Sequence, residues 1–289
     1  MATGTADADM SAGTGRLAVG FVGLGDQGLP MATAIAGVGF PLHVWARRPE
    51  SLLALGDTPH LPHDDLPSLA AACDVVALCV STDEDVLRVV RDGLLAGLRP
   101  GSVVVNHGTG TPRNAEQLTE LCAHRDVEVL DAPVSGGRPA AEARTLTVLV
   151  GGPQGAAERC EPVFRSFAAH VVRLGGTGAG QTAKLFNNAL LMMNQAAIAD
   201  IVQQADGMGL EPIALVEALK LGSASSRALT LLNTMVTPGT VGHLAEVEAL
   251  DMRLFDTAMT EGGVDASAIT ERGLDGARRL PELIDRLNP

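Results

Sequence analysis

Residues 180–195, GQTAKLFNNALLMMNQ, place one lysine and two asparagines at the start of a stretch that is otherwise typical of an apolar helix. The chain has 21 basic residues, and only Lys184 and Lys220 among them are lysines. Burial and neighbouring charges can tune a lysine to exchange a proton, whereas an arginine keeps its proton. Asn188 lies one helical turn after Lys184, so both side chains can point to one bound molecule, while Asn187 points elsewhere and has a structural role. This spacing predicts acid/base chemistry at Lys184, although a coding bias toward arginine explains the lysine count equally well.

A glycine-rich turn near the start of the chain has the spacing of a dinucleotide site. Gly23, Gly25 and Gly28 form G-x-G-x-x-G between an apolar run and a helical pattern. The first glycine makes the tight turn, the second lets the backbone approach a pyrophosphate, and the third allows close helix–strand packing. The other residues that we expect to contact the cofactor in this region are Leu24, Asp26, Gln27 and Val80.

The residues after the next predicted strand indicate which dinucleotide binds. A site for NAD would offer Asp or Glu to the ribose about 20 residues after the glycines. This chain offers Ala46, Arg47 and Arg48. Because arginine matches phosphate oxygens with a planar fork, the pair favours the 2′-phosphate of NADP(H) over NAD(H). The alternative is that both arginines are solvated surface residues and that either cofactor is accepted.

Two further loops follow predicted strands and lie where α/β sheets collect ligands. The loop at residues 106–112 is NHGTGTP, and the loop at residues 131–137 is DAPVSGG. Ser135, Gly136 and Gly137 offer a hydroxyl and flexible backbone amides to a substrate carboxylate, unless they form an ordinary turn. His107 contacts the nicotinamide or substrate, or else faces solvent.

The elements that position these residues follow two patterns. From residue 16 to about residue 174, short β-branched runs alternate with helical patterns, which predicts a doubly wound parallel sheet of the Rossmann type. Residues 83–98 fit one helix, and residues 127–135, 144–152 and 170–176 fit strands. From residue 183 onward only helical periodicity remains, broken near residues 207–212, 221–225, 237–242 and 261–265. The first of these helices, residues 181–208, would span about 40 Å.

We therefore expect an α/β protein with a disordered tail at residues 1–15, an NADP-binding domain at 16–178 and an all-helical substrate and oligomerisation domain at 179–289. The net charge of -13, with one Trp and no Tyr, argues against nucleic-acid binding. The apolar runs are too short for a membrane span, and the N-terminus lacks a signal peptide, so we expect a cytoplasmic protein. The four cysteines have no metal-like spacing, and no metal site is expected.

Taken together, GFVGLGDQG, NHGTGTP, DAPVSGG and GQTAKLFNN resemble the motifs of the β-hydroxyacid dehydrogenase family, which includes 3-hydroxyisobutyrate dehydrogenase and lies within the 6-phosphogluconate dehydrogenase superfamily. The resemblance covers nearly the whole chain after the tail. It implies that Lys184 is the general acid/base, that Asn188 orients the substrate, and that Ser135 and its glycines hold the carboxylate. Thr109 then lies beside the nicotinamide. The implied reaction interconverts a 3-hydroxy acid and its semialdehyde or keto acid.

The chain also departs from that family pattern. Asn106 and Gly108 stand where the family usually has aspartate and serine, and Gln27 replaces a methionine. Leu250, before Asp251, replaces a lysine that lies near substrate and nicotinamide in the family. The lost cation favours a less polar substrate, so an imine or bulky-carbonyl reductase on the same scaffold stays open. A catalytically silent dinucleotide-binding protein is the remaining alternative.

Other polar residues of the helical region have simpler interpretations. We expect Asp200 and Asp251 to pair at a helix surface or between domains, and Lys220 to favour the end of its helix. An apolar face on the long helix would be buried by a second subunit, which predicts a homodimer or homotetramer. Besides a second copy of the chain, the expected partner is a small-molecule substrate.

Overall fold

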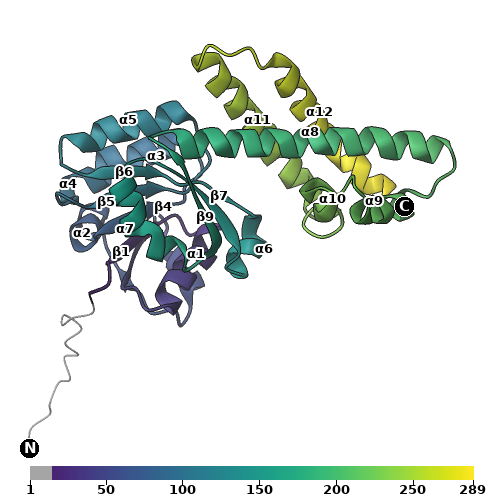
Figure 1. Cartoon of the computed structure of the whole chain (residues 1–289). Coiled ribbons are helices and arrows are strands. Elements are labelled where there is room, and N and C mark those ends of the chain that lie inside the picture. Colours follow the sequence, from purple (N-terminus) through teal and green to yellow (C-terminus); the bar gives the residue numbers. More distant parts are fainter. Residues whose placement is uncertain (1–14) are drawn as a thin grey trace, which may run out of the picture.

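The computed structural model describes residues 15–289, so the predicted tail at residues 1–15 lies outside the described residues except for Gly15. A sheet flanked by helices forms one end of the molecule, and a group of helices forms the other (Figure 1). The long helix α8 (Ala179–Gly207) runs from the sheet into the helical group. Its bounds agree closely with the helix predicted over residues 181–208.

The sheet has the order β3-β2-β1-β4-β5-β6-β8-β7, with β9 paired to β8. Strands β1 to β6 pair with one another in parallel. Because the strand order changes direction at β1 and β4, a crevice forms at the carboxyl ends of these two strands. The strands are β1 (Val19–Val22), β2 (Leu42–Trp45), β3 (Leu61–Pro62), β4 (Val75–Leu78), β5 (Val103–Asn106), β6 (Glu128–Asp131), β7 (Val134–Ser135), β8 (Leu146–Gly151) and β9 (Ala168–Gly175).

One expectation for the far edge of the sheet was wrong. The single strand predicted over residues 127–135 forms as two strands, β6 and β7, separated by Ala132 and Pro133. Proline has no N–H for a ladder, and the chain changes here from pairing with β5 to pairing with β8. Strand β8 is antiparallel to both β6 and β7, so the sheet is mixed. The short connection through α6 permits only this antiparallel return, because a parallel crossover needs a dozen residues or more.

Three of the helices against the sheet, α2, α3 and α5, begin at side-chain caps. Asp65, Thr82 and Thr111 each accept a hydrogen bond from the backbone amide three residues later. The helix predicted over residues 83–98 forms as three successive segments, with π-helical geometry in the middle one. These elements are α1 (Gly28–Gly37), η1 (Pro49–Leu55), α2 (Leu66–Ala72), α3 (Asp83–Val89), η2 (Val90–Leu94), α4 (Leu95–Gly97), α5 (Pro112–Ala123), α6 (Gly137–Glu142) and α7 (Gln154–Phe164).

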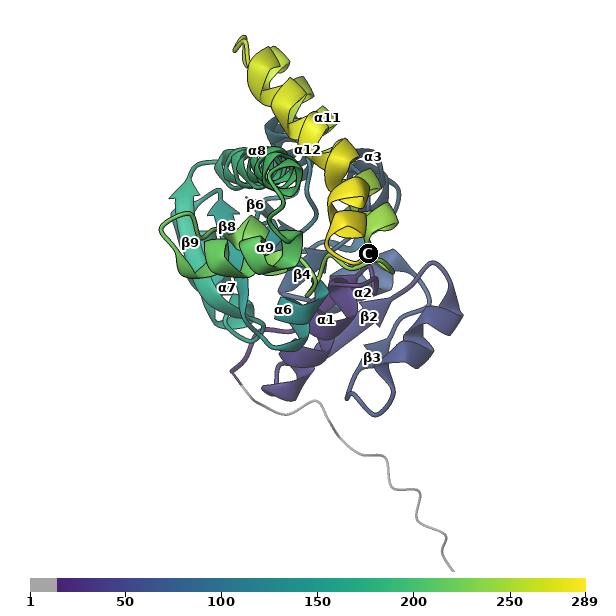
Figure 2. The same cartoon turned by 90° about the vertical axis from the view of Figure 1, so that its right-hand side faces the viewer.

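The helical part packs around α8, with loops where the sequence pattern breaks. Figure 2 views α8 almost end-on, with α11 and α12 beside it. Gly276 of α12 explains the close approach, since a Cβ there would lie 2.0 Å from the Met192 carbonyl oxygen of α8. None of the helices in residues 15–289 is long and apolar enough to cross a membrane. The remaining helices are α9 (Pro212–Leu221), α10 (Arg227–Leu231), α11 (Val241–Glu261) and α12 (Ser267–Arg286).

Candidate active site

The glycine turn between β1 and α1 has the backbone shape that the sequence predicted. Gly23 has a φ of +102°, and a Cβ there would lie 2.2 Å from the carbonyl oxygen of Cys79. A Cβ on Gly28 would lie 1.9 Å from the Gly23 oxygen. Around Gly25 a Cβ would meet nothing within 4 Å, so this residue borders open space. The N-cap residue Gln27 makes no side-chain hydrogen bond to α1. The Leu29 amide already donates to the Gly25 carbonyl oxygen at 3.0 Å, so the Gly28 amide is the one in the first turn that is left for a phosphate oxygen.

A cavity of about 430 Å³ extends from this turn along the carboxyl ends of β1, β2 and β4. Ala46, Arg47 and Arg48 line it, and both guanidiniums are exposed without an ion-pair partner among the described residues. Val80 and Leu24 also line it. The open space at the turn and the two cations without ion-pair partners leave room for a dinucleotide in this cavity.

Four residues predicted to contact the cofactor do not line this cavity. Gly28 is buried against the Gly23 carbonyl oxygen. Asp26 is exposed, with its carboxylate 3.6 Å from the Arg138 guanidinium. Gln27 lines a second cavity on the α8 side, where its Oε1 is buried without a hydrogen-bond partner. Thr109 is half-buried in the loop after β5.

The loop after β5 is held by a residue that sequence reasoning missed, Gln181 of α8. Its Nε2 donates to the Gly108 carbonyl oxygen at 2.8 Å, and its Oε1 accepts from the Gly110 amide at 2.9 Å. Thr109 lies between these two anchored residues. Asn106 accepts from the Gly108 amide at 3.0 Å through its side chain. The Gln181 side chain therefore ties this loop to the helix that carries Lys184.

A second tie runs from the end of β6 to the start of α8. Asp131 accepts hydrogen bonds from the amides of Gly178 and Gln181, each at 2.9 Å. Burial raises the pKa of this carboxyl, and the amide hydrogen bonds oppose that shift. Asp131 stands in the quoted motif DAPVSGG, but its partners lie about 50 residues later, so no local pattern indicates this pairing.

His107 lies neither beside the site nor in solvent, contrary to both expectations. Its Nδ1 is 2.8 Å from the Ala132 carbonyl oxygen, and its ring meets Phe164 and Phe167 edge-on. Burial lowers its pKa to about 4, so the imidazole is neutral near pH 7 and packs as a core residue.

The second cavity, of about 370 Å³, brings the predicted chemistry together. Ser135, Gly136 and Gly137 form one wall, and Lys184 and Asn188 of α8 form another. Gly136 and Gly137 have φ values of +133° and +68°, which favour glycine at both positions. The apolar part of the lining comes from Leu190, Leu191, Met192, Ala228, Leu231, Met235, Leu244 and Val247.

Asp251 of α11 completes this wall, although the sequence suggested only surface or interdomain pairing for it. Its Oδ2 accepts from the Asn188 amide at 2.7 Å, and its charge acts on Lys184. Burial lowers the pKa of the Lys184 ammonium and raises the pKa of the Asp251 carboxyl, and mutual attraction opposes both shifts. Asn187 also lines the cavity and donates to Asn188 Oδ1 at 3.0 Å, so it does not point away as expected. Lys184 thus lies where a proton can be exchanged.

Farther along the same two helices, Glu248 and Gln195 form a second polar pair that sequence reasoning missed. Gln195 Nε2 donates to Glu248 Oε1 at 2.9 Å, and both residues are buried. Burial raises the pKa of Glu248 to about 7, and the hydrogen bond opposes this shift. A signal existed in the sequence, since Gln195 continues the α8 face of Lys184 and Asn188 at helical spacing.

Leu250 and Asp200 lie away from the cavity. Leu250 is exposed on α11 and does not line either cavity, so the apolar character of the lining has other sources. Asp200 pairs with Arg272 and Arg279 of α12 within the helical part. Lys220 lies in the last turn of α9 and pairs with Glu217 at 2.8 Å, in keeping with a helix-end role.

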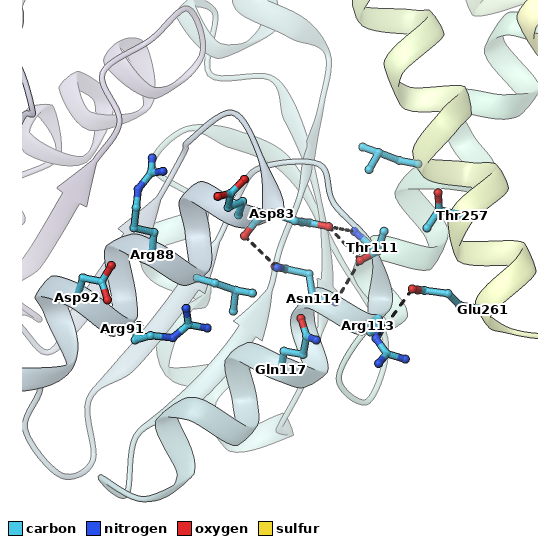
Figure 3. A pocket seen from close by; sticks show the side chains of 13 residues that line it. Asp83, Arg88, Arg91, Asp92, Thr111, Arg113, Asn114, Gln117, Thr257 and Glu261 are labelled. Atoms are coloured by element: carbon cyan, nitrogen blue, oxygen red, sulfur yellow. Dashed lines mark hydrogen bonds and ion pairs between the residues drawn. The ribbon is translucent and has the colours of Figure 1, made fainter.

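A larger groove of about 640 Å³ lies between α3, α5 and α11 (Figure 3). None of the residues predicted from the sequence to form the site lines it. Asp83, which lines this groove, holds the end of the loop after β5. Its Oδ2 accepts hydrogen bonds from both the amide and the hydroxyl of Thr111. Arg113 of α5 reaches Glu261 of α11 at 3.9 Å across the groove.

Comparisons with known proteins agree with this geometry. Residues 18–176 match the family described as the NAD binding domain of 6-phosphogluconate dehydrogenase, and residues 178–271 match the family described as NAD-binding of NADP-dependent 3-hydroxyisobutyrate dehydrogenase. NAD-dependent L-serine dehydrogenase of Pseudomonas aeruginosa is 32% identical over 83% of this chain and 84% of its own. 3-Hydroxyisobutyrate dehydrogenase of the same organism is 33% identical over 74% of this chain and 73% of its own.

A solved structure extends the similarity to three dimensions. Mycobacterium tuberculosis 3-hydroxyisobutyrate dehydrogenase with L-serine superimposes with a TM-score of 0.84 at 26% identity, and the match covers 95% of this chain and 100% of that one.

Proposed function

The chain belongs to the β-hydroxyacid dehydrogenase family and is an NAD(P)-dependent dehydrogenase, and from this premise we propose that it interconverts a 3-hydroxy acid and its semialdehyde or keto acid with NADP(H). The observation that carries the proposal is the arrangement of Lys184, Asn188 and Asp251 beside Ser135 in one cavity. These side chains come from three elements that are distant in sequence, and they face the same space.

In this proposal Gly23, Gly25 and the Gly28 amide at the start of α1 hold the pyrophosphate, and Thr109 lies near the nicotinamide. A bound nicotinamide dinucleotide would supply or accept the hydride. Arg47 and Arg48 bind the 2′-phosphate, because both are unpaired on the cofactor cavity.

Lys184 acts as the general acid/base. In reduction its ammonium donates a proton to the carbonyl oxygen, and in oxidation its neutral amine takes the proton of the hydroxyl. Its lowered pKa makes the neutral form accessible. Asn188 orients the reacting oxygen while Asp251 fixes the amide, and Ser135, Gly136 and Gly137 bind the carboxylate.

We also propose that the protein is a homodimer or homotetramer. Phe186, Leu190 and Ile201 of α8 and the C-cap residue Met208 are exposed by 47% to 82%, and their spacing places them along one side of the helix. An apolar stripe of this kind is stabilised by burial against a second copy. Leu190→Glu should shift the protein toward monomer in light scattering, and a monomeric parent protein would contradict the proposal.

The test of activity is oxidation of 3-hydroxyisobutyrate, L-serine and 3-hydroxypropionate with NADP⁺ and NAD⁺, beside reduction of semialdehydes, bulky ketones and cyclic imines with NADPH. L-serine is included because two of the similar proteins are named with it. The apolar lining of the cavity favours including the bulky carbonyls.

Lys184→Ala should lower kcat by about 100- to 10,000-fold, the range of general acid/base catalysis. Lys220→Ala, at the chain's only other lysine, is the control and should retain full activity. If only imines or neutral carbonyls react, or if Lys184→Ala remains fully active, the hydroxyacid proposal fails.

A further inference from the structure

Asp83, the first residue of α3, joins the loop after β4 to the loop after β5. Val80, three residues before it, lines the cofactor cavity. The Asp83 Oδ2 atom accepts hydrogen bonds from the Thr111 amide at 3.0 Å and from the Thr111 hydroxyl at 2.9 Å (Figure 3). The Asp83 carbonyl oxygen accepts a third, from Asn114 Nδ2 at 3.0 Å. The start of α3 is therefore fastened to the end of the loop that carries Thr109.

The other oxygen of this carboxyl faces Gly110. Asp83 Oδ1 is buried and has no hydrogen-bond partner among the described residues. A Cβ on Gly110 would lie 1.9 Å from this oxygen, and the three atoms nearest to that Cβ all belong to the Asp83 carboxyl. The φ of Gly110 lies outside the left-handed region, so its backbone does not require glycine. The position excludes a larger residue because Asp83 occupies the space.

The Asp83 carboxylate restricts this loop more tightly than a neutral side chain would. Burial raises the pKa of Asp83, and the two hydrogen bonds from Thr111 oppose this shift. Hydrogen bonds to an ionised acceptor are shorter and stronger than those to a neutral one. Gln181 of α8 already holds Gly108 and Gly110, on either side of Thr109 in the chain. With Asp83 on Gly110 and Thr111, the loop is held from two elements that are distant in sequence.

We propose that Asp83 is a positioning residue for hydride transfer, which fixes Gly110 and Thr111 and thereby places Thr109 against the nicotinamide. This inference rests on the proposed function, in which the nicotinamide lies near Thr109. Asp83 lines neither the cofactor cavity nor the substrate cavity, so it acts through the loop. Because Val80 lies in the segment that leads to Asp83, the same contact joins the cofactor cavity to the nicotinamide end of the site.

The first test separates turnover from binding in Asp83→Ala. Its kcat should fall by about tenfold or more, because small displacements of reacting groups slow an enzyme strongly. The KM for the hydroxy acid and the Kd for NADPH should change less, and the primary deuterium isotope effect on kcat should rise as hydride transfer becomes the slow step. Asp83→Asn keeps an acceptor and the size of the side chain, so it should lose less activity. Glu84→Gln, at an exposed carboxylate in the same turn, is the control and should match the parent protein.

The contact with Gly110 allows a second test that a general disturbance of α3 would not reproduce. Gly110→Ala in the parent protein should lower kcat by about tenfold or more, because the methyl group must displace the loop or the carboxyl. In the Asp83→Ala background the carboxyl no longer occupies that space, so Gly110→Ala should add little to the loss. The two substitutions should therefore be strongly non-additive.

The third test needs no turnover. The dihydronicotinamide ring is the fluorophore of NADPH, so its emission in the complex should differ between the parent protein and Asp83→Ala. The affinity for 2′,5′-ADP, which has no nicotinamide, should be equal in both proteins when quenching of Trp45 is measured.

Three results would overturn the positioning role: unchanged kcat and emission in Asp83→Ala, additive losses with Gly110→Ala, or an equal loss of affinity for NADPH and 2′,5′-ADP. If the parent protein turns over no hydroxy acid and no semialdehyde, the proposed function falls. The emission of bound NADPH then decides by itself whether Asp83 positions the nicotinamide.

Discussion

The sheet end and the helical end of this molecule build their parts of the site in different ways. At the sheet end the two cavities are bordered mainly by backbone and glycines in short consecutive segments, such as Gly23 to Gly25 and Ser135 to Gly137. At the helical end they are side chains spaced along α8 and α11, and pairs such as Asn188 with Asp251 are joined across 63 positions of sequence.

Because of this difference, the two ends should be sensitive to different kinds of change. A site built from backbone depends on space, so an added methyl group disrupts it while the fold persists. A site built from facing side chains depends on the charges and hydrogen bonds that two helices bring together, and its behaviour changes with pH. Four experiments test this contrast.

The largest effect should come from the helical end, at the buried Glu248 carboxyl. Burial raises its pKa from 4.5 to about 7, so the folded protein binds this proton more tightly than the unfolded chain does. The stabilising contribution is complete below pH 4.5 and is lost as the pH rises through about 7. Glu248→Gln has no such ionisation. Its free energy of unfolding relative to the parent protein should therefore increase by about 3 kcal/mol between pH 4 and pH 8.

Urea unfolding of both proteins at several pH values measures this difference, and Glu246→Gln serves as the exposed control. A difference that stays constant from pH 4 to pH 8 would show that Glu248 does not change its proton affinity on folding.

At the sheet end, Gly25→Ala tests whether the turn acts through empty space. A Cβ at Gly25 meets no protein atom within 4 Å, so the thermal stability should be unchanged. The methyl group would occupy the space where the backbone approaches a pyrophosphate, and we expect the Kd for NADPH to rise by about 100-fold. Quenching of Trp45, which lines the same cavity, reports binding. Gly155→Ala, at an equally open position in α7, should change neither quantity, and unaltered NADPH affinity in Gly25→Ala would refute the assignment.

Gln181 joins the two ends, and its removal should misalign them. Gln181→Leu deletes both hydrogen bonds to the loop after β5, and small displacements of reacting groups slow an enzyme strongly, so kcat should fall about 30-fold. KM and NADPH affinity should change less, because the residues assigned to binding stay in place. Gln181→Glu keeps only the hydrogen-bond acceptor, so its kcat should lie between those of the parent protein and of Gln181→Leu. Thr182→Val in the same turn is the control, and an equal kcat loss there would indicate a general disturbance of α8.

The part of this molecule that the sequence predicted is the part built from local patterns. The glycine turn, the span of α8 and the shared face of Lys184 and Asn188 depend on spacing within a few turns of chain, and the structure has all three. Asp131 and Gln181 act on partners 47 to 73 positions away, which no local pattern encodes.

His107 and Asp251 also show that a local sequence pattern does not predict contacts made by tertiary packing. For both residues the sequence offers only the residue type and the polarity of the neighbouring residues. Their roles depend on what tertiary packing places around them: two phenylalanines around the imidazole, and the amide of Asn188 with the charge of Lys184 around the carboxylate.

The smallest effect should come from the side chains at the sheet end, where Arg47 and Arg48 are the exception to backbone recognition. Both are exposed on the cofactor cavity, so solvent weakens their attraction for a phosphate, and we expect the double variant Arg47→Ala/Arg48→Ala to raise the KM for NADPH by only about tenfold. The KM for NADH should stay unchanged, because NADH lacks the 2′-phosphate. Arg253→Ala, an exposed arginine of α11 away from both cavities, controls for the loss of positive charge. Equal changes for both cofactors would mean that the arginines act on the shared pyrophosphate or on the fold, and that specificity between the cofactors lies elsewhere on the cavity. A rise in KM confined to NADPH would instead show that the sheet end recognises the 2′-phosphate through side chains. Recognition through side chains is what we propose for the whole of the helical end.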